Sequence, residues 1–585
     1  MRQSNYDKFP VCHIDGFDDQ CWAGWEEIGA QLRATVDQRG TKAVIIECYP
    51  GAHDDELLPA LSQQLKAARV INMRDLLLPP EEIAKLVERD VTDDPVFGYL
   101  SSLELLDCFN TEKFFEQLRE VQNGAGLMLV YGAGASFFSS AQPQSNILVY
   151  ADLARWELQM RMRRNEISNL GADNADEKWS LQYKRAFFVD WRVADKHKKH
   201  ALKRADFVLD TNTAGQPKLI TREAFRGALD QVSSRPFRVV PFFDPAPWGG
   251  QWMKEVCDLD RSAPNYGWCF DCVPEENSLL LGFGGHTVEI PSIDLVFFRP
   301  RELLGEAVHG RFGTEFPIRF DFLDTMGGGK LSFQVHPLTE YIQEKFGMHY
   351  TQDESYYMLD AGPDACVYLG LKDDIDRSEM TLELVRAETG ECTFDDTKYV
   401  NRYPAKKHDH FLIPAGTVHC SGAEAMVLEI SATPYNFTFK MWDWGRMGLD
   451  GKPRPVHLAH GIANIGWDRT TAWVQRELIN TVSEIAQGEG WREERTGLHE
   501  REFIETRRHW FTGTVPHDTN GGVNVLNLVE GEEAIVESPT GAFAPFVIHY
   551  AETFIVPAAV GPYTIRPHGP GKAQQCATLK ACVRN

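Results

Sequence analysis

The sequence lacks long hydrophobic runs and an excess of positive charge. No uninterrupted apolar run approaches membrane-spanning length, and residues 1–8 are polar, without the apolar core of a signal peptide. The formal net charge of −24 argues against nucleic acid or an anionic membrane as a partner, because both require clustered cations. We therefore expect a cytoplasmic protein with no membrane or nucleic-acid partner. A small anionic ligand needs only a few local donors and is not excluded.

Closely spaced cysteines are also scarce. The twelve cysteines are scattered, and the one close pair is Cys269 and Cys272. A lone Cys-x-x-Cys without a second pair is weak evidence for a zinc or redox site. Reduced, structurally passive thiols, as in cytoplasmic proteins, are the favoured interpretation.

Alternating strand and helix patterns mark the first part of the chain. Lys42–Tyr49 has the composition of a buried strand and is followed by a turn and a helical run at Glu56–Leu65. Leu127–Tyr131 and Asn146–Tyr150 are two further apolar strands. This order predicts an α/β domain with a parallel sheet. The segment resembles a nucleoside-kinase or P-loop-like domain.

The catalytic parts of such a kinase are missing. A phosphate-binding loop needs glycine-rich backbone amides together with a Lys and a Ser/Thr hydroxyl. The turn Pro50–Asp55 contains no Lys, Ser or Thr, and it ends in two acidic residues. The Gly132-Ala133-Gly134 turn is equally compatible with a tight connection and with an anion site. We therefore expect a degenerate domain that does not transfer phosphoryl groups. Nucleotide binding without turnover is left open.

Two basic segments follow. Leu153–Arg164 has apolar residues at helical spacing, which favours a helix with one packed face and one solvated basic face over a lid that binds an anion. Asp195–His200 is interpreted in the same way, as a solvated helix face. Turn-forming residues at Asn212–Pro217 indicate a domain boundary.

Four residues in the middle of the chain have the types and spacing of a metal site: Gln334, His336, Glu354 and His419. Gln334 and His336 are two apart in a strand-like run, so their side chains share one face. Glu354 precedes an apolar and aromatic strand, and His419 follows a Pro-Ala-Gly turn. Two imidazoles, a carboxylate and an amide oxygen suit Zn²⁺ or another divalent cation with an open coordination position.

These segments resemble class I mannose-6-phosphate isomerases, zinc-dependent aldose–ketose isomerases with a cupin-type fold. Leu331–Pro337 looks like the family's Leu-Ser-x-Gln-x-His-Pro motif, and Pro414–His419 looks like its Pro-x-Gly-Thr-x-His motif. Trp248–Gly250, Tyr368–Lys372 and Glu552–Ala558 continue the resemblance in the same order, so that it spans about residues 235 to 585. It implies the four metal ligands named above.

The predicted fold class is multidomain. A degenerate kinase-like α/β domain with a parallel sheet is expected at residues 1–214. A metal-binding cupin domain is expected at residues 215–450. A helical segment and a second, cupin-like β-barrel are expected at residues 451–585. With 43% hydrophobic residues in 585, each part can bury a core.

Two positions depart from the family pattern. Gln352 stands where short bacterial members carry a lysine, two residues before the metal glutamate, and Lys440 stands where an arginine is expected in the run Thr438–Arg446. Lysine keeps the charge but loses the planar fork. Lys440, Arg446 and Lys372 are the candidate catalytic residues.

Ser332 and Gln352 are the candidate substrate-binding residues, Ser332 because it looks like the family's phosphate-contacting serine. The proton carrier is not assigned by sequence: Lys372, Lys440, His410 and a metal-bound water remain alternatives.

The resemblance implies interconversion of an aldose phosphate and a ketose phosphate, with mannose 6-phosphate and fructose 6-phosphate as the expected pair. Two alternatives stay open: a zinc-containing cupin that binds a sugar or sugar phosphate without turnover, and an isomerase of a non-phosphorylated sugar. Gln352 and Lys440 favour these alternatives somewhat. The expected partner is a small sugar phosphate, and a homo-oligomer is left open.

Overall fold

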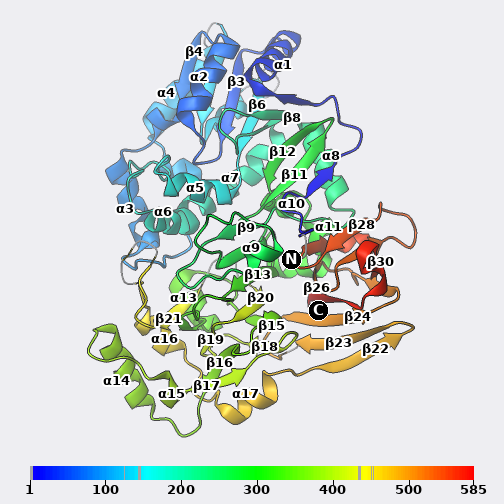
Figure 1. Cartoon of the computed structure of the whole chain (residues 1–585). Coiled ribbons are helices and arrows are strands. Elements are labelled where there is room, and N and C mark those ends of the chain that lie inside the picture. The colour runs from blue at the N-terminus through cyan, green and yellow to red at the C-terminus, as the bar shows by residue number, and fades with distance from the viewer. Residues whose placement is uncertain are drawn as a thin grey trace. The chain divides into compact units, whose positions relative to one another are not determined.

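The computed structural model describes residues 4–123, 126–141, 146–432, 437–448, 451, 454–497 and 499–584. The chain forms two compact units (Figure 1). The α/β unit comprises Val11–Gln231 and Ser278–Phe298, and the β unit comprises Met1–Pro10, Val232–Asn277 and Arg299–Asn585. The α/β unit is therefore built from two separate stretches of chain. The three-domain division at residues 214 and 450 stays a prediction.

The α/β unit contains a seven-stranded sheet of order β2-β8-β7-β6-β3-β5-β4. Its central strands are parallel, and β8 pairs antiparallel with both β7 and β2. The strands are β2 (Cys21–Ala23), β3 (Ala43–Cys48), β4 (Arg69–Asn72), β5 (Met128–Gly132), β6 (Asn146–Asp152), β7 (Phe207–Asp210) and β8 (Lys218–Thr221). A small second sheet joins β1 (Val11–His13), β11 (Ser278–Phe283) and β12 (His286–Pro291).

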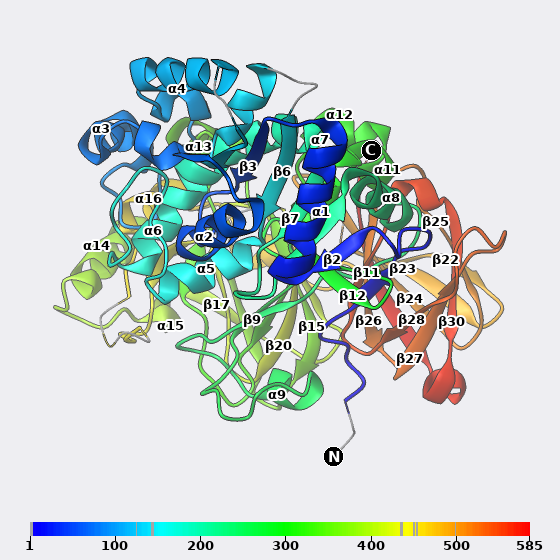
Figure 2. The same ribbon diagram turned by 90° about the horizontal axis from the view of Figure 1, so that it is seen from above.

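The predicted parallel α/β pattern is confirmed. The three expected strands are β3, β5 and β6, and they are buried along their length, as parallel strands covered on both faces must be. Leucines and isoleucines of α1 and α2 pack on one face of the sheet (Figure 2). The helices of this unit are α1 (Gly24–Arg39), α2 (Asp54–Leu65), η1 (Met73–Leu76), α3 (Pro80–Val91), η2 (Leu105–Cys108), α4 (Thr111–Asn123), η3 (Ala135–Ala141), α5 (Arg155–Arg163), α6 (Trp179–Arg185), η4 (Ala186–Asp190), α7 (Trp191–Arg204), α8 (Arg222–Val232) and α10 (Ile293–Phe298).

Three basic residues of α5 and α7 are buried, so the expectation of a solvated basic face was wrong for them. Arg155 is buried against Asp195, and Arg161 is buried against Glu157 with a nitrogen–oxygen distance of 2.9 Å. Lys198 of α7 is 1% exposed. Local periodicity identified the helices but could not show that acidic partners elsewhere in the chain would bury these cations.

Lys198 lies between two buried carboxylates, with its ammonium 2.7 Å from Asp152 and 2.5 Å from Asp294. Burial acts against the charge of this lysine, but the two carboxylates outweigh burial and raise the pKa of Lys198. Burial, together with the charge of Asp152, raises the pKa of Asp294 well above its usual range.

The β unit begins with two facing sheets. One has six strands in the order β18-β15-β20-β13-β10-β9, and the other has five in the order β17-β16-β19-β14-β21. The strands are β9 (Phe242–Asp244), β10 (Trp268–Cys272), β13 (Arg319–Asp324), β14 (Phe333–Val335), β15 (Glu354–Ala361), β16 (Cys366–Leu371), β17 (Val400–Pro404), β18 (His410–Ile413), β19 (His419–Ser421), β20 (Ala425–Ser431) and β21 (Phe439–Trp442).

Two further sheets form the C-terminal part of the β unit, in the orders β22-β23-β24-β31-β26-β29 and β25-β30-β27-β28. Their inner faces share one apolar core. The strands are β22 (Ser483–Gly488), β23 (Trp491–Gly497), β24 (Ile504–Phe511), β25 (Val515–Asp518), β26 (Asn524–Glu530), β27 (Glu533–Glu537), β28 (Phe546–His549), β29 (Thr553–Val556), β30 (Pro562–Pro567) and β31 (Cys576–Val583). This agrees with the mostly β architecture predicted for the second half of the chain.

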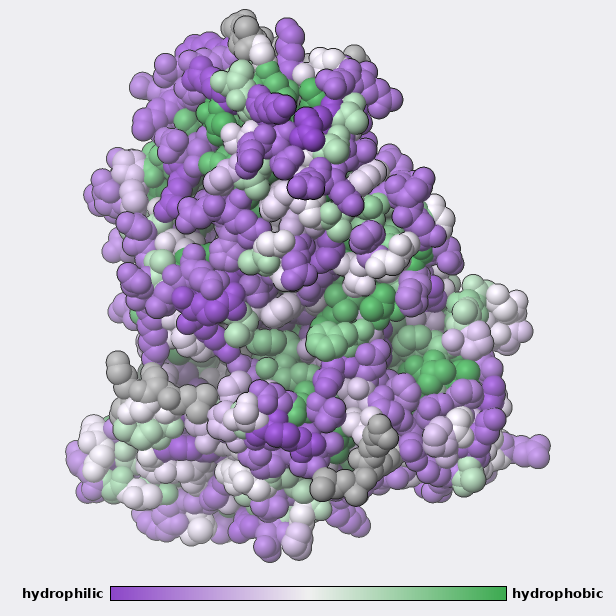
Figure 3. All heavy atoms as spheres, turned by 45° about the horizontal axis from the view of Figure 1, so that its top comes forward, coloured by the Kyte–Doolittle hydropathy of each residue, from purple (hydrophilic) through white to green (hydrophobic). Residues whose placement is uncertain are grey.

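Short helices connect the strands of the β unit. They are α9 (Trp252–Val256), α11 (Pro300–Leu304), α12 (Glu306–Phe312), α13 (Thr339–Phe346), α14 (Arg377–Glu388), α15 (Asp396–Tyr399), α16 (Leu458–Asn464), α17 (Thr471–Glu477), η5 (Ala558–Val560) and η6 (Gly569–Ala573). No helix in the described ranges is both long and apolar enough to cross a membrane. The face drawn in Figure 3 is mostly hydrophilic, with hydrophobic residues in small groups.

The cysteines are free thiols. Both members of the Cys269 and Cys272 pair are buried in β10, and burial raises the pKa of each thiol well above its usual range. Such thiols are poor nucleophiles and poor metal ligands. The passive role expected for this pair fits its environment.

Replacing Lys198 with Ala should lower the free energy of unfolding of the α/β unit by about 3–5 kcal/mol, because a buried carboxylate loses its cation. Lys203→Ala, at an exposed position of the same helix, is the matched control and should change it little. Urea denaturation followed by fluorescence measures both. Equal midpoints for the two variants would contradict the assigned role of Lys198.

Candidate functional site

Three strands of the five-stranded sheet place polar side chains in one row. Gln334 of β14 is the Cα partner of His419 on β19 and of Lys440 on β21. Directly opposite residues of antiparallel strands point to the same face, with Cβ atoms about 5 Å apart. An imidazole, an amide and an amine therefore lie side by side. Glu354, the first residue of β15, reaches this row from the six-stranded sheet.

The glutamate lies between two imidazoles. Oε1 of Glu354 is 2.8 Å from Nε2 of His419, and Oε2 is 3.0 Å from Nε2 of His336. The side-chain amide of Gln334 is 3.0 Å from the same nitrogen of His419. The two histidines and the glutamate form a buried cluster with ligand atoms close enough to share one metal ion. The structure thus brings together the four predicted metal ligands.

Both imidazoles are held by their other ring nitrogen. Nδ1 of His336 lies 2.9 Å from the carbonyl oxygen of Phe437, and Nδ1 of His419 lies 2.9 Å from that of Thr417. A carbonyl only accepts, so each Nδ1 carries the proton and each Nε2 keeps its lone pair. Nε2 of His336 is buried without a hydrogen-bond partner among the described residues. This arrangement fits a borderline divalent cation such as Zn²⁺.

The two predicted substrate-binding residues contact the ligand set. The hydroxyl of Ser332 donates to Oε1 of Gln334 at 3.0 Å. The amide of Gln352 donates to Oε2 of Glu354 at 3.3 Å and accepts from the backbone N–H of Phe437 at 2.9 Å. Both side chains are buried. Their contacts in this structure orient Gln334 and Glu354.

Charge coupling in the cluster is strong. Burial favours a neutral carboxyl, but His336 and His419 hold the pKa of Glu354 well below its usual range. Burial likewise opposes the charge of His336, and the nearby Glu354 outweighs it and raises the pKa of this imidazole. A divalent ion bound between these groups would be held by the carboxylate and by the unprotonated Nε2 atoms.

Two buried acidic residues near Glu354, Glu429 and Asp321, were not found from the sequence. Burial, then the charges of Glu354 and Asp321, raise the pKa of Glu429 well above its usual range. Burial raises the pKa of Asp321 to about 8, with Asp271 and Glu354 adding to it against Arg319. Glu429 interrupts the apolar strand Ala425–Ser431, and this interruption was the available signal.

A group of cations lies beyond β21. Asp443 binds Arg446 at 3.0 Å and Arg454 at 2.7 Å. Burial and the charges of both arginines, against Asp443, lower the pKa of Lys440 to about 7. Lys330 lies over the ring of Trp444, 3.8 Å from its centroid. Of these cations, Arg454 and Lys330 were missed by the sequence analysis.

Two residues considered for catalysis lie elsewhere. The ammonium of Lys372 donates to the carbonyl of Thr397 at an exposed position. His410 pairs in register with Tyr357 and not with Glu354, and its Nδ1 is 3.0 Å from the carbonyl of Thr496. Burial lowers the pKa of His410 to about 3. The contacts of these two residues are not with the cluster.

Sequence comparison relates part of the chain to sugar-phosphate isomerases. The chain is 26% identical over 233 residues to mannose-6-phosphate isomerase ManA of Bacillus subtilis (strain 168), which covers 40% of this chain and 68% of that protein. It is 25% identical over 240 residues to mannose-6-phosphate isomerase of Streptococcus mutans, covering 40% of this chain and 70% of that protein. About 40% of the chain is thus similar to this family of enzymes.

Structure comparison finds partial matches. The mannose 6-phosphate isomerase from Bacillus subtilis matches with a TM-score of 0.49 and 18% identity, over 59% of this chain and 99% of that one. A zinc-bound mannose 6-phosphate isomerase matches with a TM-score of 0.46 and 14% identity, over 60% of this chain and all of the other. Residues 24–234 match a domain family described as a domain of unknown function, DUF8485.

Protein purified without chelator should contain about one divalent metal ion per chain, since the ligand types suit one such ion. The double variant His336→Ala and His419→Ala should lose it, because only a carboxylate and an amide remain. His309→Ala, an exposed histidine that bonds within its own helix end, is the control and should retain the metal. Mass spectrometry of metals measures all three proteins. Full metal content in the double variant would place the ion elsewhere.

Proposed function

We propose that the β unit is a divalent-metal-dependent isomerase that interconverts an aldose phosphate and a ketose phosphate, with mannose 6-phosphate and fructose 6-phosphate as the pair. The observation that carries the proposal is the buried cluster of His336, Glu354 and His419, with Gln334 adjacent and Lys440 beside it on the next strand. The similarity to mannose-6-phosphate isomerases over about 40% of the chain supports the same reaction class.

The reaction moves a proton between neighbouring carbons. The carbon-bound proton next to a carbonyl is only weakly acidic, and its removal leaves a negatively charged enediolate. The activation barrier of the isomerisation therefore falls when this charge is stabilised. A bound divalent ion supplies Lewis acidity toward the sugar oxygens. Lys440 is placed one strand from Gln334 and supplies a positive charge beside those oxygens. Gln352 and the carbonyls of Phe437 and Thr417 hold Glu354 and the two imidazoles in fixed orientations.

The phosphate group needs cations outside the cluster. Arg446 and Arg454 are fixed on the two oxygens of Asp443, so both guanidiniums are oriented before a ligand arrives. One carboxylate leaves a net positive charge on this trio. We assign the phosphate to this region, with Arg446 as its principal contact. Ser332 then acts through Gln334 and does not need to touch the phosphate.

A second candidate is binding without turnover. It is favoured by Gln352, where a neutral amide bonded to Glu354 and Phe437 replaces a cation near the metal glutamate. It is also favoured by Lys372, whose ammonium is engaged by Thr397. A sugar would then bind the metal and the cations with no group positioned to move the proton.

A coupled assay on the zinc-loaded protein separates the candidates. Mannose 6-phosphate and fructose 6-phosphate should be interconverted, whereas unphosphorylated mannose and fructose should react far more slowly because they cannot use Arg446. Turnover of the free sugars alone would identify a different isomerase. Binding of the phosphates by calorimetry without turnover would establish the second candidate.

The pH dependence tests the charge on Lys440. Its pKa is lowered to about 7, so its ammonium form predominates below that pH and is lost above it. If the ammonium stabilises the enediolate, kcat/KM should fall as pH rises through about 7. Lys440→Arg stays protonated and should lose this decline. Lys440→Ala should reduce kcat by about a hundredfold or more.

Two results would revise this role. A rate that rises through about pH 7 and loses that rise in Lys440→Arg would make Lys440 the proton acceptor. An unchanged rate in Lys440→Ala would assign the charge to Arg446. Lys398→Ala, at an exposed lysine of the same unit, is the control and should behave as the parent protein.

A further inference from the structure

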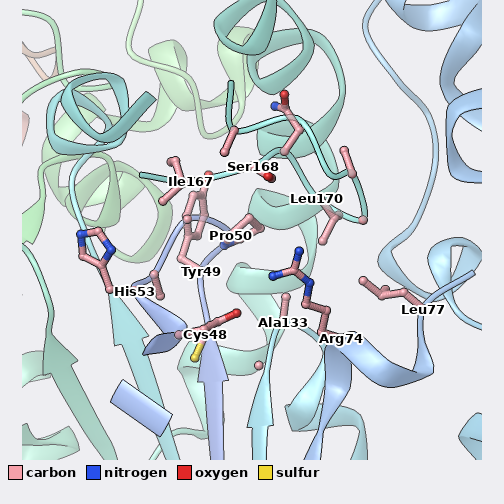
Figure 4. Close-up of a pocket in the computed structure, with 18 of the residues that line it drawn as sticks. Cys48, Tyr49, Pro50, His53, Arg74, Leu77, Ala133, Ile167, Ser168 and Leu170 are labelled. Carbon is pink, nitrogen blue, oxygen red and sulfur yellow. The ribbon is translucent and has the colours of Figure 1, made fainter. Parts of the chain in front are cut away.

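The α/β unit contains a cavity of about 300 Å³ that no comparison assigns. It lies at the carboxyl ends of β3, β4 and β5, between the segment at residues 49–55, which comprises the β3–α2 loop and the start of α2, and the loop at residues 166–175 (Figure 4). Strand β3 has β5 on one side and β6 on the other, so the chain reverses direction across the sheet at this strand. Ligands of open parallel sheets bind at such a switch point. The volume is at the low end of the range of about 300–1,000 Å³ for small-molecule pockets.

The charges of the lining oppose a phosphate ligand. Asp54, Asp55 and Glu166 contribute three carboxylates, and Arg74 contributes the one permanent cation of the lining. His53 adds no charge near neutrality, because burial and the neighbouring Arg161 lower the pKa of its imidazole. The net charge of the lining is therefore about −2 at neutral pH. An anionic ligand would be repelled by the first turn of α2.

The glycine turn beside the pocket is already occupied by a carboxylate of the protein. The backbone N–H groups of Gly134 and Ser136 donate to the two oxygens of Glu47, at 2.7 and 2.6 Å. Glu47 is 1% exposed. These amides are the ones that a phosphate would use in a glycine-rich loop. The turn thus serves the packing of β3 and is not open to an external anion.

Among the polar groups that line the pocket are a donor and an acceptor of opposite charge that can reach a ligand. In Figure 4 the guanidinium of Arg74 points into the space between Pro50 and the loop that carries Ser168 and Leu170. No side-chain bond of Arg74 is found among the described residues, and it lies close enough to Asp54 to lower the pKa of that carboxyl against the effect of burial. Asp54 uses one oxygen to accept from Tyr131 at 2.8 Å and keeps the other.

We propose that this pocket binds a neutral, hydroxyl-rich small molecule of the size of a monosaccharide or a nucleoside. Neighbouring hydroxyls of such a ligand donate to Asp54 and accept from Arg74, whereas a phosphate dianion could accept from Arg74 but has no proton to donate to Asp54. Pro50, Ile167 and Leu170 provide apolar contact for its C–H face. The site lies wholly within the α/β unit and does not depend on the proposed isomerase activity.

Hydrogen exchange of the full-length protein tests the site. D-mannose and adenosine are the neutral probes, each at about 10 mM, tenfold above a Kd of about 1 mM. At least one should protect the peptides that span residues 49–57 and 166–175. Magnesium pyrophosphate is the anionic probe and should not. Repeating the experiment with the His336→Ala and His419→Ala variant excludes transmission from the metal site.

Matched variants identify the contacts. Arg74→Gln and Asp54→Asn each remove one charge-assisted contact and should weaken binding about tenfold or more. Arg69→Gln, on the strand that precedes Arg74 but outside the pocket, is the control and should not. Arg74 is exposed, so its replacement should leave the fold intact. The proposal is overturned if neither neutral probe protects these loops, if pyrophosphate protects them more strongly, or if Arg74→Gln binds as well as the parent.

Discussion

The β unit depends on one buried carboxylate. Glu354 is removed from water, and its two oxygens lie 3.0 and 2.8 Å from Nε2 of His336 and of His419, an arrangement that would be costly without fixed partners. The backbone of Phe437 supplies part of that fixation: its N–H donates to Gln352 and its C=O accepts from His336. Gln352 in turn donates to Glu354, so this one residue of the backbone helps to hold both the carboxylate and an imidazole. Three segments distant in sequence are thereby held in one geometry before any ligand binds.

Much of this site could be predicted because strand alternation is a local property. Gln334 and His336 are two residues apart, so their shared face followed from sequence, and His419 was recognised by the Pro-Ala-Gly turn before it. The buried acidic residues next to Glu354 could not be predicted in the same way. Glu429 lies beside Glu354 only because β20 is the neighbour of β15, and strand order across a sheet is not encoded in local pattern.

In the α/β unit, too, contacts between segments distant in sequence could not be predicted from local pattern. The strands β3, β5 and β6 were predictable from their continuous apolar runs. The burial of lysines and arginines in the helices that follow could not be predicted. A basic helical run has the same sequence pattern whether its side chains face water or a buried carboxylate. Asp294, which binds Lys198, comes from a segment almost a hundred residues further along the chain. Lys198 is thus buried in part by a contact with a segment that is distant in sequence.

The two departures from the isomerase pattern, Gln352 and Lys440, each have a physical consequence in this structure. Gln352 both donates and accepts, whereas a lysine there could only donate and would leave the buried N–H of Phe437 unpaired. Burial and the charges of Arg446 and Arg454 lower the pKa of Lys440 to about 7, so Lys440 titrates near neutrality, which an arginine would not do. In the proposed isomerase, an incoming phosphate dianion would favour the charged form of Lys440 and a neutral sugar would not, so the charge at the reacting oxygens would be linked to the presence of the phosphate.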